Sequence, residues 1–419
     1  MSGKTIVERI LSRASGKDAR AGDVVVARIA KLMTGEGRTP DAMLLWEQLG
    51  KRPGMNPQDV ALFMDHMSTV PTVRAAALHA KMRRWAAEHG WHLFDVGMGI
   101  SHGIFPERGW ILPGEVIVCA DGHSCTYGAL NAFAMSMSSS EVAITLQTGK
   151  LWFEVPRTIR AELNGALPRW VTAKDVILHL LGIYGADGAS GCCVEFAGST
   201  VDQMGVDARL TLANMVVEMG GSCGLMACNP AVLDYAQARA DRPFEAVQGD
   251  ADAAYQAHWV HEVSKIEPHV ACPPRHDNVV PLGEVAGTPI TMVFLGSCTN
   301  GRYEDLSAAA EVMRGRTVAK GVRMFVAPAS RDALVQAEAT GIVRTLIEAG
   351  ALLLPPGCSA CAADINGSAV AADEDVVVAT SSRNYQGRMG SEKAQIYLAS
   401  PAVAAAAAVT GQLRNPNTL

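Results

Sequence analysis

The sequence predicts an α/β fold, and three observations support that prediction. Short apolar runs recur along the chain, each bounded by glycine or proline. Runs of this length are typical of strands buried on both faces of a mostly parallel sheet. Helical stretches lie between several of the runs, which predicts βαβ units. Hydrophobic residues make up 49% of the 419 residues, which is enough for a sizeable core.

The elements follow in order along the chain. Residues 23–32 form the first strand-like segment. Residues 72–89 predict an amphipathic helix, because basic residues separate apolar ones at helical spacing, namely Val73, Ala76, Ala77, Ala80 and Met82. Further strands are expected at 91–97, 115–120, 159–163, 290–295, 322–327, 351–354 and 375–380. Further helices are expected at 173–182, 304–315 and 330–349.

Residues 266–287 are the best candidate linker. This segment is rich in proline and polar residues, with Pro268, Pro273, Pro274 and Pro281. We therefore expect a domain boundary at the end of this segment, between residues 1–285 and residues 286–419.

Composition excludes several classes of protein. The chain has 36 Lys and Arg against 42 Asp and Glu, a net charge of −6, so no basic excess is present to bind nucleic acid. A small anionic substrate needs only a local cluster of arginines. The longest apolar stretches, such as 402–409, are far shorter than the roughly 20 residues that span a bilayer. The first residues show no signal region, so we expect a cytoplasmic protein without a membrane segment.

The ten cysteines do not resemble a disulfide scaffold in a chain of this length. We expect most of them to be small buried hydrophobic residues in a reducing compartment. These are Cys119, Cys192, Cys193, Cys223, Cys228 and Cys272.

Three cysteines lie on glycine-containing turns directly after predicted strands. Cys298 follows the run 290–295, and Cys358 and Cys361 follow the run 351–354. Three thiolates are one short of a closed tetrahedral zinc site, but they fit a four-iron cluster with one iron open to substrate. On spacing alone, three unrelated buried cysteines stay an alternative. A thioredoxin-like redox pair is disfavoured, because no aromatic residue precedes the Cys-x-x-Cys motif.

Carboxylates and histidines gather at other predicted strand ends and loops. A carboxylate beside a histidine fixes the tautomer of the ring and raises its basicity, which general acid–base catalysis requires. Each pair taken singly is more often an ordinary hydrogen bond, whereas several pairs beside a metal site favour catalysis. The candidates are Asp65, His66, His102, Asp121, His123 and Glu218, with Asn214 on the same helical face as Glu218 if residues 211–219 are helical.

Four strings resemble the aconitase superfamily. They are ADGHSCTYGALNAFA (120–134), GSCTNGRYEDL (296–306), PPGCSAC (355–361) and SSRNYQGRMGSEKAQIYLASPAVAAAAA (381–408). The resemblance extends over nearly the whole chain, including MDHMST (64–69) and KLWFEVPRTIR (150–160), and is strongest to the large subunits of isopropylmalate isomerases. It implies an aconitase-type three-domain (α/β/α) core around one iron–sulfur site, without the swivel domain. Domains 1 and 2 are expected in residues 1–285, and domain 3, which carries the cluster cysteines, in residues 286–419.

The resemblance also implies roles for individual residues. Cys298, Cys358 and Cys361 match the ligands of a [4Fe–4S] cluster whose open iron acts as a Lewis acid on the substrate's hydroxyl and carboxylate. The matching carboxylate–histidine pairs are Asp65 with His66, Asp121 with His102, and Glu218 with His123. Asn214 and Asn300 match polar residues near the cluster, and Arg383 and Arg388 match arginines that bind substrate carboxylate bidentately.

The implied reaction is the reversible dehydration and rehydration of a hydroxy dicarboxylic acid, with 3-isopropylmalate of leucine biosynthesis as the expected substrate. Gly122 stands where the family usually has serine, which removes a polar contact to substrate. Sister substrates therefore stay open, namely 2,3-dimethylmalate, homoaconitate, maleate and citraconate.

The chain ends at Leu419, soon after the motifs of the third domain. Fused aconitases continue into a mobile fourth domain that supplies a catalytic serine base and a further arginine. We therefore expect a separate small swivel-domain subunit as partner. A cluster-free regulatory or RNA-binding relative is the alternative from another class, and the net charge of −6 and the three cysteines disfavour it.

Overall fold

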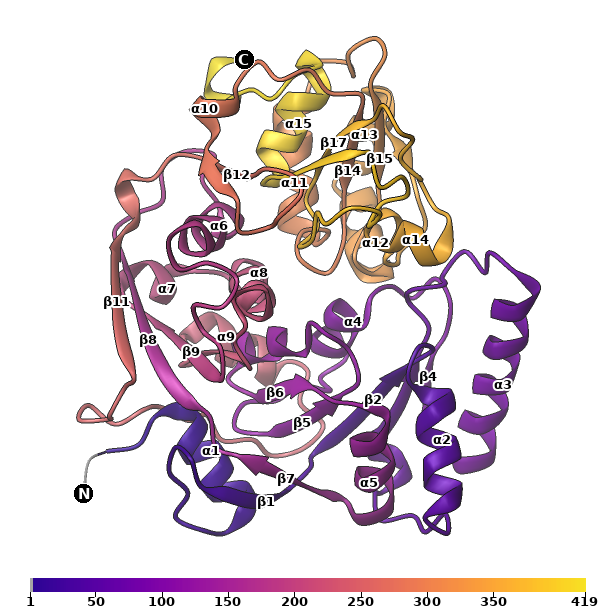
Figure 1. Ribbon diagram of the computed structural model, residues 1–419, viewed down its shortest axis with the longest axis vertical. Coiled ribbons are helices and arrows are strands. Elements are labelled where there is room, and N and C mark those ends of the chain that lie inside the picture. The colour runs from indigo at the N-terminus through magenta and orange to yellow at the C-terminus, as the bar shows by residue number, and fades with distance from the viewer. Residues whose placement is uncertain (1–2) are drawn as a thin grey trace.

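The structure is a computed structural model that describes residues 3–419 (Figure 1). Its N-terminal part contains a five-stranded, fully parallel sheet. In spatial order the strands are β4 (His92–Phe94), β3 (Val60–Phe63), β2 (Lys31–Gly35), β5 (Val116–Cys119) and β6 (Phe133–Ser136). The helices of this part are α2 (Thr39–Gln48), α3 (Val73–His89), α4 (Ser101–Glu107) and α5 (Ser139–Thr148), with a 3-10 helix η2 at Ser124–Leu130.

Two smaller sheets follow in the N-terminal two thirds of the chain. An antiparallel pair joins β1 (Val24–Arg28) to β7 (Lys150–Glu154), beside α1 (Ile6–Ser15). A parallel four-stranded sheet has the order β10 (Gly224–Met226), β9 (Cys192–Ala197), β8 (Arg157–Asn164) and β11 (Ala257–Glu262). Its helices are α6 (Ala173–Tyr184), α7 (Ser199–Gln203), α8 (Val206–Asn214) and α9 (Pro230–Gln237), with 3-10 helix η3 at Met215–Met219.

The C-terminal part, orange to yellow in Figure 1, contains a seven-stranded mixed sheet. Its order is β13 (Val279–Pro281), β12 (His269–Ala271), β18 (Gln395–Leu398), β17 (Val376–Ala379), β14 (Met292–Leu295), β15 (Arg323–Val326) and β16 (Leu352–Leu353). The helices of this part are α10 (Leu282–Val285), α11 (Tyr303–Met313), α12 (Arg331–Ala339), α13 (Ile342–Glu348), α14 (Ala363–Asn366) and α15 (Pro401–Thr410). No helix among residues 3–419 is both long enough and apolar enough to cross a membrane.

The predicted α/β class is confirmed, but several elements differ from expectation. The segment 23–32 divides into β1 and the start of β2, which belong to different sheets. The expected helix 330–349 divides into α12 and α13. The candidate linker 266–287 is not a simple linker, because it contributes β12 and β13 to the edge of the C-terminal sheet. The boundary at residues 285 and 286 stays a prediction.

Helix α3 forms where expected but buries a different face. Thr72 accepts a hydrogen bond from the Ala75 amide at the N-terminus, and Gly90 ends the helix with a φ of +66°. The buried residues are Ala75, His79, Met82, Trp85 and Ala86, whereas Val73 is 88% exposed. The predicted face was therefore wrong except at Met82, because the helix buries the stripe that contains Trp85 and His79, and Ala76, Ala77 and Ala80 lie outside it.

The fold brings the carboxyl ends of strands from two sheets to one place. Asp65 follows β3, Asp121 follows β5, and Cys298 follows β14. Two backbone hydrogen bonds join the parts beside this place, from Ile100 N to Ala329 O at 2.7 Å and from Arg331 N to Met98 O at 2.8 Å. Ligand sites of α/β proteins form at such strand ends.

Candidate functional site

A cavity of about 320 Å³ lies between the strand ends of the two parts. Its walls combine charged and apolar side chains, which suits a small anionic molecule with an alkyl portion. The lining side chains include Glu36, Arg38, Phe63, His66, Met67, Asp121, His123, Ile365, Arg383 and Arg388, with Gly122 at the backbone.

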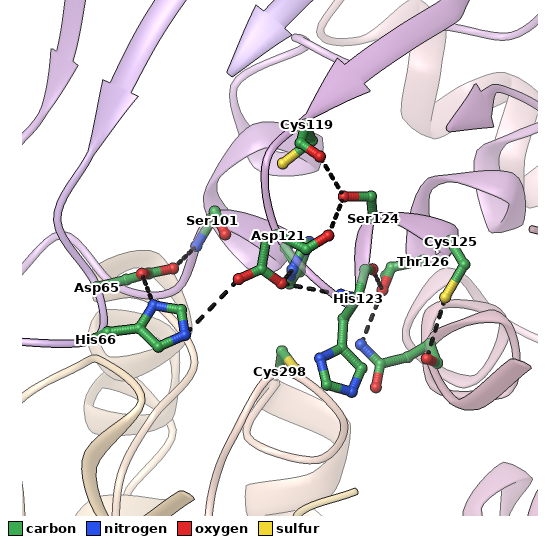
Figure 2. Close-up of polar contacts among 12 residues, drawn as sticks. Asp65, His66, Ser101, Cys119, Asp121, His123, Ser124, Cys125, Thr126 and Cys298 are labelled. Atoms are coloured by element: carbon green, nitrogen blue, oxygen red, sulfur yellow. Dashed lines mark hydrogen bonds and ion pairs between the residues drawn. The ribbon is translucent and has the colours of Figure 1, made fainter. Parts of the chain in front are cut away.

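Two predicted pairs form a continuous chain of contacts on one wall. His66 Nδ1 lies 2.7 Å from Asp65 Oδ1, and His66 Nε2 lies 3.7 Å from Asp121 Oδ2 (Figure 2). Asp121 Oδ1 lies 2.6 Å from His102 Nε2, and His102 Nδ1 lies 3.1 Å from the Tyr127 hydroxyl. The carboxylate of Asp121 therefore contacts the imidazole rings of both His66 and His102.

The neighbouring charges determine the protonation states of His66 and Asp121. Burial opposes the charged form of His66, but the carboxylates of Asp65 and Asp121 outweigh burial and raise its pKa to about 10. Burial likewise opposes the charged form of Asp121, but His102 and His66 hold the pKa of that carboxyl well below its ordinary value. His66 thus carries a proton at neutral pH.

The third predicted pair lies on the neighbouring wall. His123 Nε2 lies 2.9 Å from Glu218 Oε1, and Arg383 Nε donates to the same oxygen at 2.8 Å. Burial would raise the pKa of Glu218, but His123 and Arg383 lower it to about 2. Burial lowers the pKa of His123, and the charge of Arg383 lowers it further. An ionised carboxylate thus accepts hydrogen bonds from a neutral ring and from a guanidinium.

The three cysteines converge beside these pairs. Cys298 and Cys358 pack in one buried cluster with Ile100, Ala329 and Ala362. Cys298 points toward the space between His66 and His123 (Figure 2). Burial and the neighbouring charge of Cys361 raise the pKa of Cys298 to about 12. The pKa of Cys358 is also raised, by burial, by the charge of Asp65 and by the other two thiolates.

Cys358 also links the cysteines to the first pair. A carboxylate oxygen of Asp65, a ring nitrogen of His66 and the sulfur of Cys358 all lie within 4.8 Å of one another. The Cys358 amide donates to Asp65 O at 3.0 Å. At the third cysteine, an Arg388 N–H points to Cys361 Sγ at 3.8 Å.

Each of the two turns that carry the cysteines contains a residue other than glycine with a positive φ. Ser297 has a φ of +84° and Ser359 a φ of +44°, so each neighbours a candidate ligand in the left-handed region. Strained residues of this kind persist where the surrounding structure holds them, often at functional sites. Gly357 must be glycine, because an added Cβ would lie 2.8 Å from the Cβ of Ser68.

The residues present fit an iron–sulfur cluster by their chemistry. Thiols with raised pKa values stay protonated in water, but a coordinated metal ion deprotonates them outright. The guanidinium of Arg388 lies beside Cys361 Sγ, and the positive charges of Arg388 and Arg383 would offset part of the negative charge that three thiolates would bring. All ten cysteines are free in the described residues, so none of the three is used in a disulfide.

Asn214 and Asn300 lie behind the cavity and do not line it. Asn214 donates to Thr126 Oγ1 and accepts from Thr299 Oγ1, both at 2.8 Å. Asn300 donates to Asp305 Oδ1 at 2.8 Å. Both amides therefore brace the turn that carries Cys298, and Arg383 and Arg388 are the predicted substrate-binding residues that reach the cavity.

Sequence reasoning missed four residues at the site. Glu36 is 2% exposed and accepts from the amides of Asp65 and Met67, at 3.3 and 2.8 Å, so it holds the turn that carries His66. Ser382 Oγ lies 2.9 Å from His123 Nε2. Arg38 lines the cavity, and within residues 3–419 its guanidinium has no hydrogen-bond or ion-pair partner. Lys174 is buried behind the turn after β17.

Signals for two of these residues are present in the sequence. Glu36 and Arg38 follow the apolar residues of β2 in a glycine-containing turn, the same pattern that marks Asp121 and Cys298. The cysteines expected to be small buried residues behave as predicted at Cys119, Cys192, Cys193 and Cys223, whereas Cys228 and Cys272 are half-buried.

Comparisons with known proteins give a family match and relatives over the full length of the chain. The model of the aconitase family (aconitate hydratase) matches residues 58–288 and 283–411. The chain is 46% identical to 3-isopropylmalate dehydratase large subunit 1 of Methanopyrus kandleri, covering 99% of each chain. It is 42% identical to a probable 3-isopropylmalate dehydratase large subunit of Methanothermobacter thermautotrophicus, again covering 99% of each chain. A probable methanogen homoaconitase large subunit of the same organism is also 42% identical, with 98% of this chain and 97% of that one covered.

A solved structure shares the fold. The crystal structure of Thermococcus kodakaraensis aconitase X in its holo form matches with a TM-score of 0.52 at 10% identity, covering 88% of each chain. At this identity the likeness concerns the arrangement of the chain alone.

Proposed function

Since this chain belongs to the aconitase family, we propose that it is the large subunit of an iron–sulfur hydro-lyase that isomerises 3-isopropylmalate by dehydration and rehydration. The observation that carries the proposal is that three buried thiols lie beside three carboxylate–histidine pairs, and that residues of each pair line one cavity or contact its lining residues. The two relatives named 3-isopropylmalate dehydratase large subunit match over 99% of this chain and 99% of their own length.

Cys298, Cys358 and Cys361 would hold a [4Fe–4S] cluster, and when bound this group supplies an open, Lewis-acidic iron for the hydroxyl that leaves. His66 is protonated at neutral pH and lies beside Cys358, so it is placed to give a proton to the departing hydroxide. Asp65 and Asp121 keep that ring oriented and charged.

The second wall binds and orients the substrate. The guanidinium groups of Arg383 and Arg388 reach the cavity and suit carboxylate binding. Glu218 fixes Arg383 through the hydrogen bond at 2.8 Å, so the guanidinium meets the substrate in one orientation. Phe63, Met67 and Ile365 add an apolar surface for an alkyl group such as isopropyl.

Gly122 leaves open space beside this wall. A Cβ added at Gly122 would lie 3.6 Å from Arg383 Nη2, which is an ordinary contact. Serine would therefore fit, and glycine here enlarges the room next to Arg383 without changing the turn.

A homoaconitase is the second candidate, and Arg38 favours it. Its unpartnered guanidinium would suit a substrate that carries an additional carboxylate in place of the alkyl group. The relative named as a homoaconitase subunit is as similar to this chain as one of the dehydratase subunits.

We further propose that a small swivel-domain subunit completes the site. The relatives are named large subunits, which implies a second chain. A base must remove the proton from the carbon next to the carboxylate on the face opposite the hydroxyl, and the partner would supply it. Ten free thiols suit a reducing compartment, which supports a cytoplasmic location.

The test is anaerobic reconstitution of the chain with iron and sulfide, followed by assays with and without a small subunit of the same family. We expect the mixture, but not the chain alone, to convert 3-isopropylmalate. Turnover of homoaconitate without turnover of 3-isopropylmalate would select the second candidate. Full turnover by the chain alone would contradict the two-subunit proposal, and turnover of neither 3-isopropylmalate nor homoaconitate by the mixture would contradict the proposed function.

A further inference from the structure

Helix α6 carries a lysine whose ammonium group is fully buried. Lys174 is 0% exposed, and its Nζ donates to Ser381 O at 2.6 Å and to Thr380 O at 3.2 Å. Within residues 3–419, no carboxylate oxygen lies within 4.0 Å of Nζ. Asp175, the next residue, instead caps α6 at Thr172 and accepts from the His269 amide. A buried cation without a carboxylate partner is costly and calls for an explanation.

The two carbonyls that Lys174 holds belong to the turn after β17. Thr380 Oγ1 accepts from Gly296 N at 2.9 Å, so the turn is tied to the loop of Cys298. The next two residues of the turn are Ser382, beside His123, and Arg383, bound to Glu218. Lys174 therefore anchors the backbone from which two cavity contacts project.

The ammonium group of Lys174 also lies near the loops that carry the candidate cluster ligands. The turn that Lys174 holds is tied through Thr380 to Gly296, two residues before Cys298. Burial lowers the pKa of Lys174 to about 8, and thiolates at Cys298 and Cys361 would oppose this effect. Two of the three candidate cluster ligands thus lie within electrostatic reach of a cation that water does not screen. Thiolates at these positions would provide the negative charge that the buried ammonium lacks.

We propose that Lys174 is a positioning residue with two tasks at this site. It fixes the turn of residues 380–383, and its charge offsets the thiolates of a cluster held by Cys298, Cys358 and Cys361. The inference rests on the proposed cluster site. It concerns a residue that touches neither the cavity nor the sulfurs through a hydrogen bond.

The test compares three variants after anaerobic reconstitution. Lys174→Met removes the charge at similar length, Lys174→Arg keeps the charge, and Lys31→Met removes another buried lysine, one paired with Asp59 at 2.6 Å. The readouts are the reduction potential of the cluster, followed by electron paramagnetic resonance, and the turnover number with the small subunit.

We expect Lys174→Met to give a more negative reduction potential, because an added electron loses a nearby positive charge. Its turnover should fall at least tenfold, because the turn that carries Arg383 is released. Lys174→Arg should restore the potential, and Lys31→Met should keep the wild-type potential.

The outcomes separate this inference from the proposed function. If the wild-type chain takes up no cluster, the proposed function fails. If the wild-type chain takes up a cluster and Lys174→Met shows the same potential and turnover, the inference is wrong. If Lys174→Met does not fold, Lys174→Gln, which keeps an N–H donor without charge, replaces it. An unchanged potential in Lys174→Gln would overturn the proposal, and a more negative one would support it.

Discussion

His123 Nε2 lies 2.9 Å from Glu218 Oε1, although the two residues are 95 positions apart in the chain. His123 lies in the turn between β5 and η2, and Glu218 lies in η3 beside α8. Arg383, from the C-terminal part, binds the same carboxylate oxygen at 2.8 Å. The cavity wall therefore depends on three segments that only the folded chain brings together.

The first prediction concerns the thiols. Replacing Cys298, Cys358 or Cys361 by serine should abolish cluster binding, because a hydroxyl is a poor ligand for iron at such a site. Iron and sulfide content after reconstitution and the visible absorption spectrum measure this. Cys192→Ala and Cys223→Ala are matched controls, since both residues are buried free thiols outside the cluster that contains Cys298 and Cys358. Full iron content in all three serine variants would contradict the assignment.

The second prediction concerns the shared carboxylate. Asp121→Asn should lower kcat by about 10²–10⁴-fold, because His66 and His102 lose the charge that orients them. KM should change little, because Arg383 and Arg388 remain. Asp95→Asn serves as the control, since Asp95 pairs with Arg83 at the surface. An unchanged kcat in Asp121→Asn would make the pair an ordinary structural hydrogen bond.

The third prediction concerns acid stability. The pKa of Glu218 is lowered to about 2 in the folded chain, from an ordinary value near 4.5. A lowered folded pKa adds stability that is fully present above the unfolded value and is lost as pH falls through the folded one. Glu218 should contribute on the order of 3 kcal/mol at pH 6, declining between about pH 4.5 and pH 2. Urea unfolding at pH 6 and pH 3 should show a steeper loss for the wild type than for Glu218→Gln. An equal loss of unfolding free energy in the two proteins would show that ionisation of Glu218 does not stabilise the fold.

The fourth prediction concerns the free guanidinium. If Arg38 binds a substrate carboxylate, Arg38→Met should raise KM about tenfold for homoaconitate and leave KM for 3-isopropylmalate nearly unchanged. Steady-state assays of both substrates with the reconstituted two-subunit enzyme measure this difference. An equal change in KM for both substrates would show that Arg38 does not bind the additional carboxylate of homoaconitate.

Some features of the fold and of the site can be predicted from the sequence, for physical reasons. An apolar run followed by glycine and a polar motif marks the end of a buried strand, and this pattern places Asp121, Cys298 and Cys358 at strand-end turns. Parallel strands then bring such turns to one edge of a sheet. The Cys-x-x-Cys spacing is a local feature of the sequence, so it can be recognised without knowledge of the fold.

Other features depend on contacts that no local pattern encodes. The partner of His102 is 19 positions away and that of His123 is 95 positions away, so the pairs followed from family resemblance and not from spacing. A lysine in a helix is ordinarily solvent-exposed, and nothing near Lys174 in the sequence shows that two carbonyls of residues 380 and 381 surround it. The division of segment 23–32 was also missed, because the connection between β1 and β2 contains neither glycine nor proline.

The most direct test of the central claim is the dependence of turnover on cluster content in the two-subunit enzyme. The same preparation is assayed with 3-isopropylmalate after chelation of its iron and again after stepwise reconstitution with iron and sulfide. We predict no turnover in the iron-free sample and a rate that rises in proportion to the measured cluster occupancy. Turnover in the iron-free sample equal to that of the reconstituted enzyme would contradict the account.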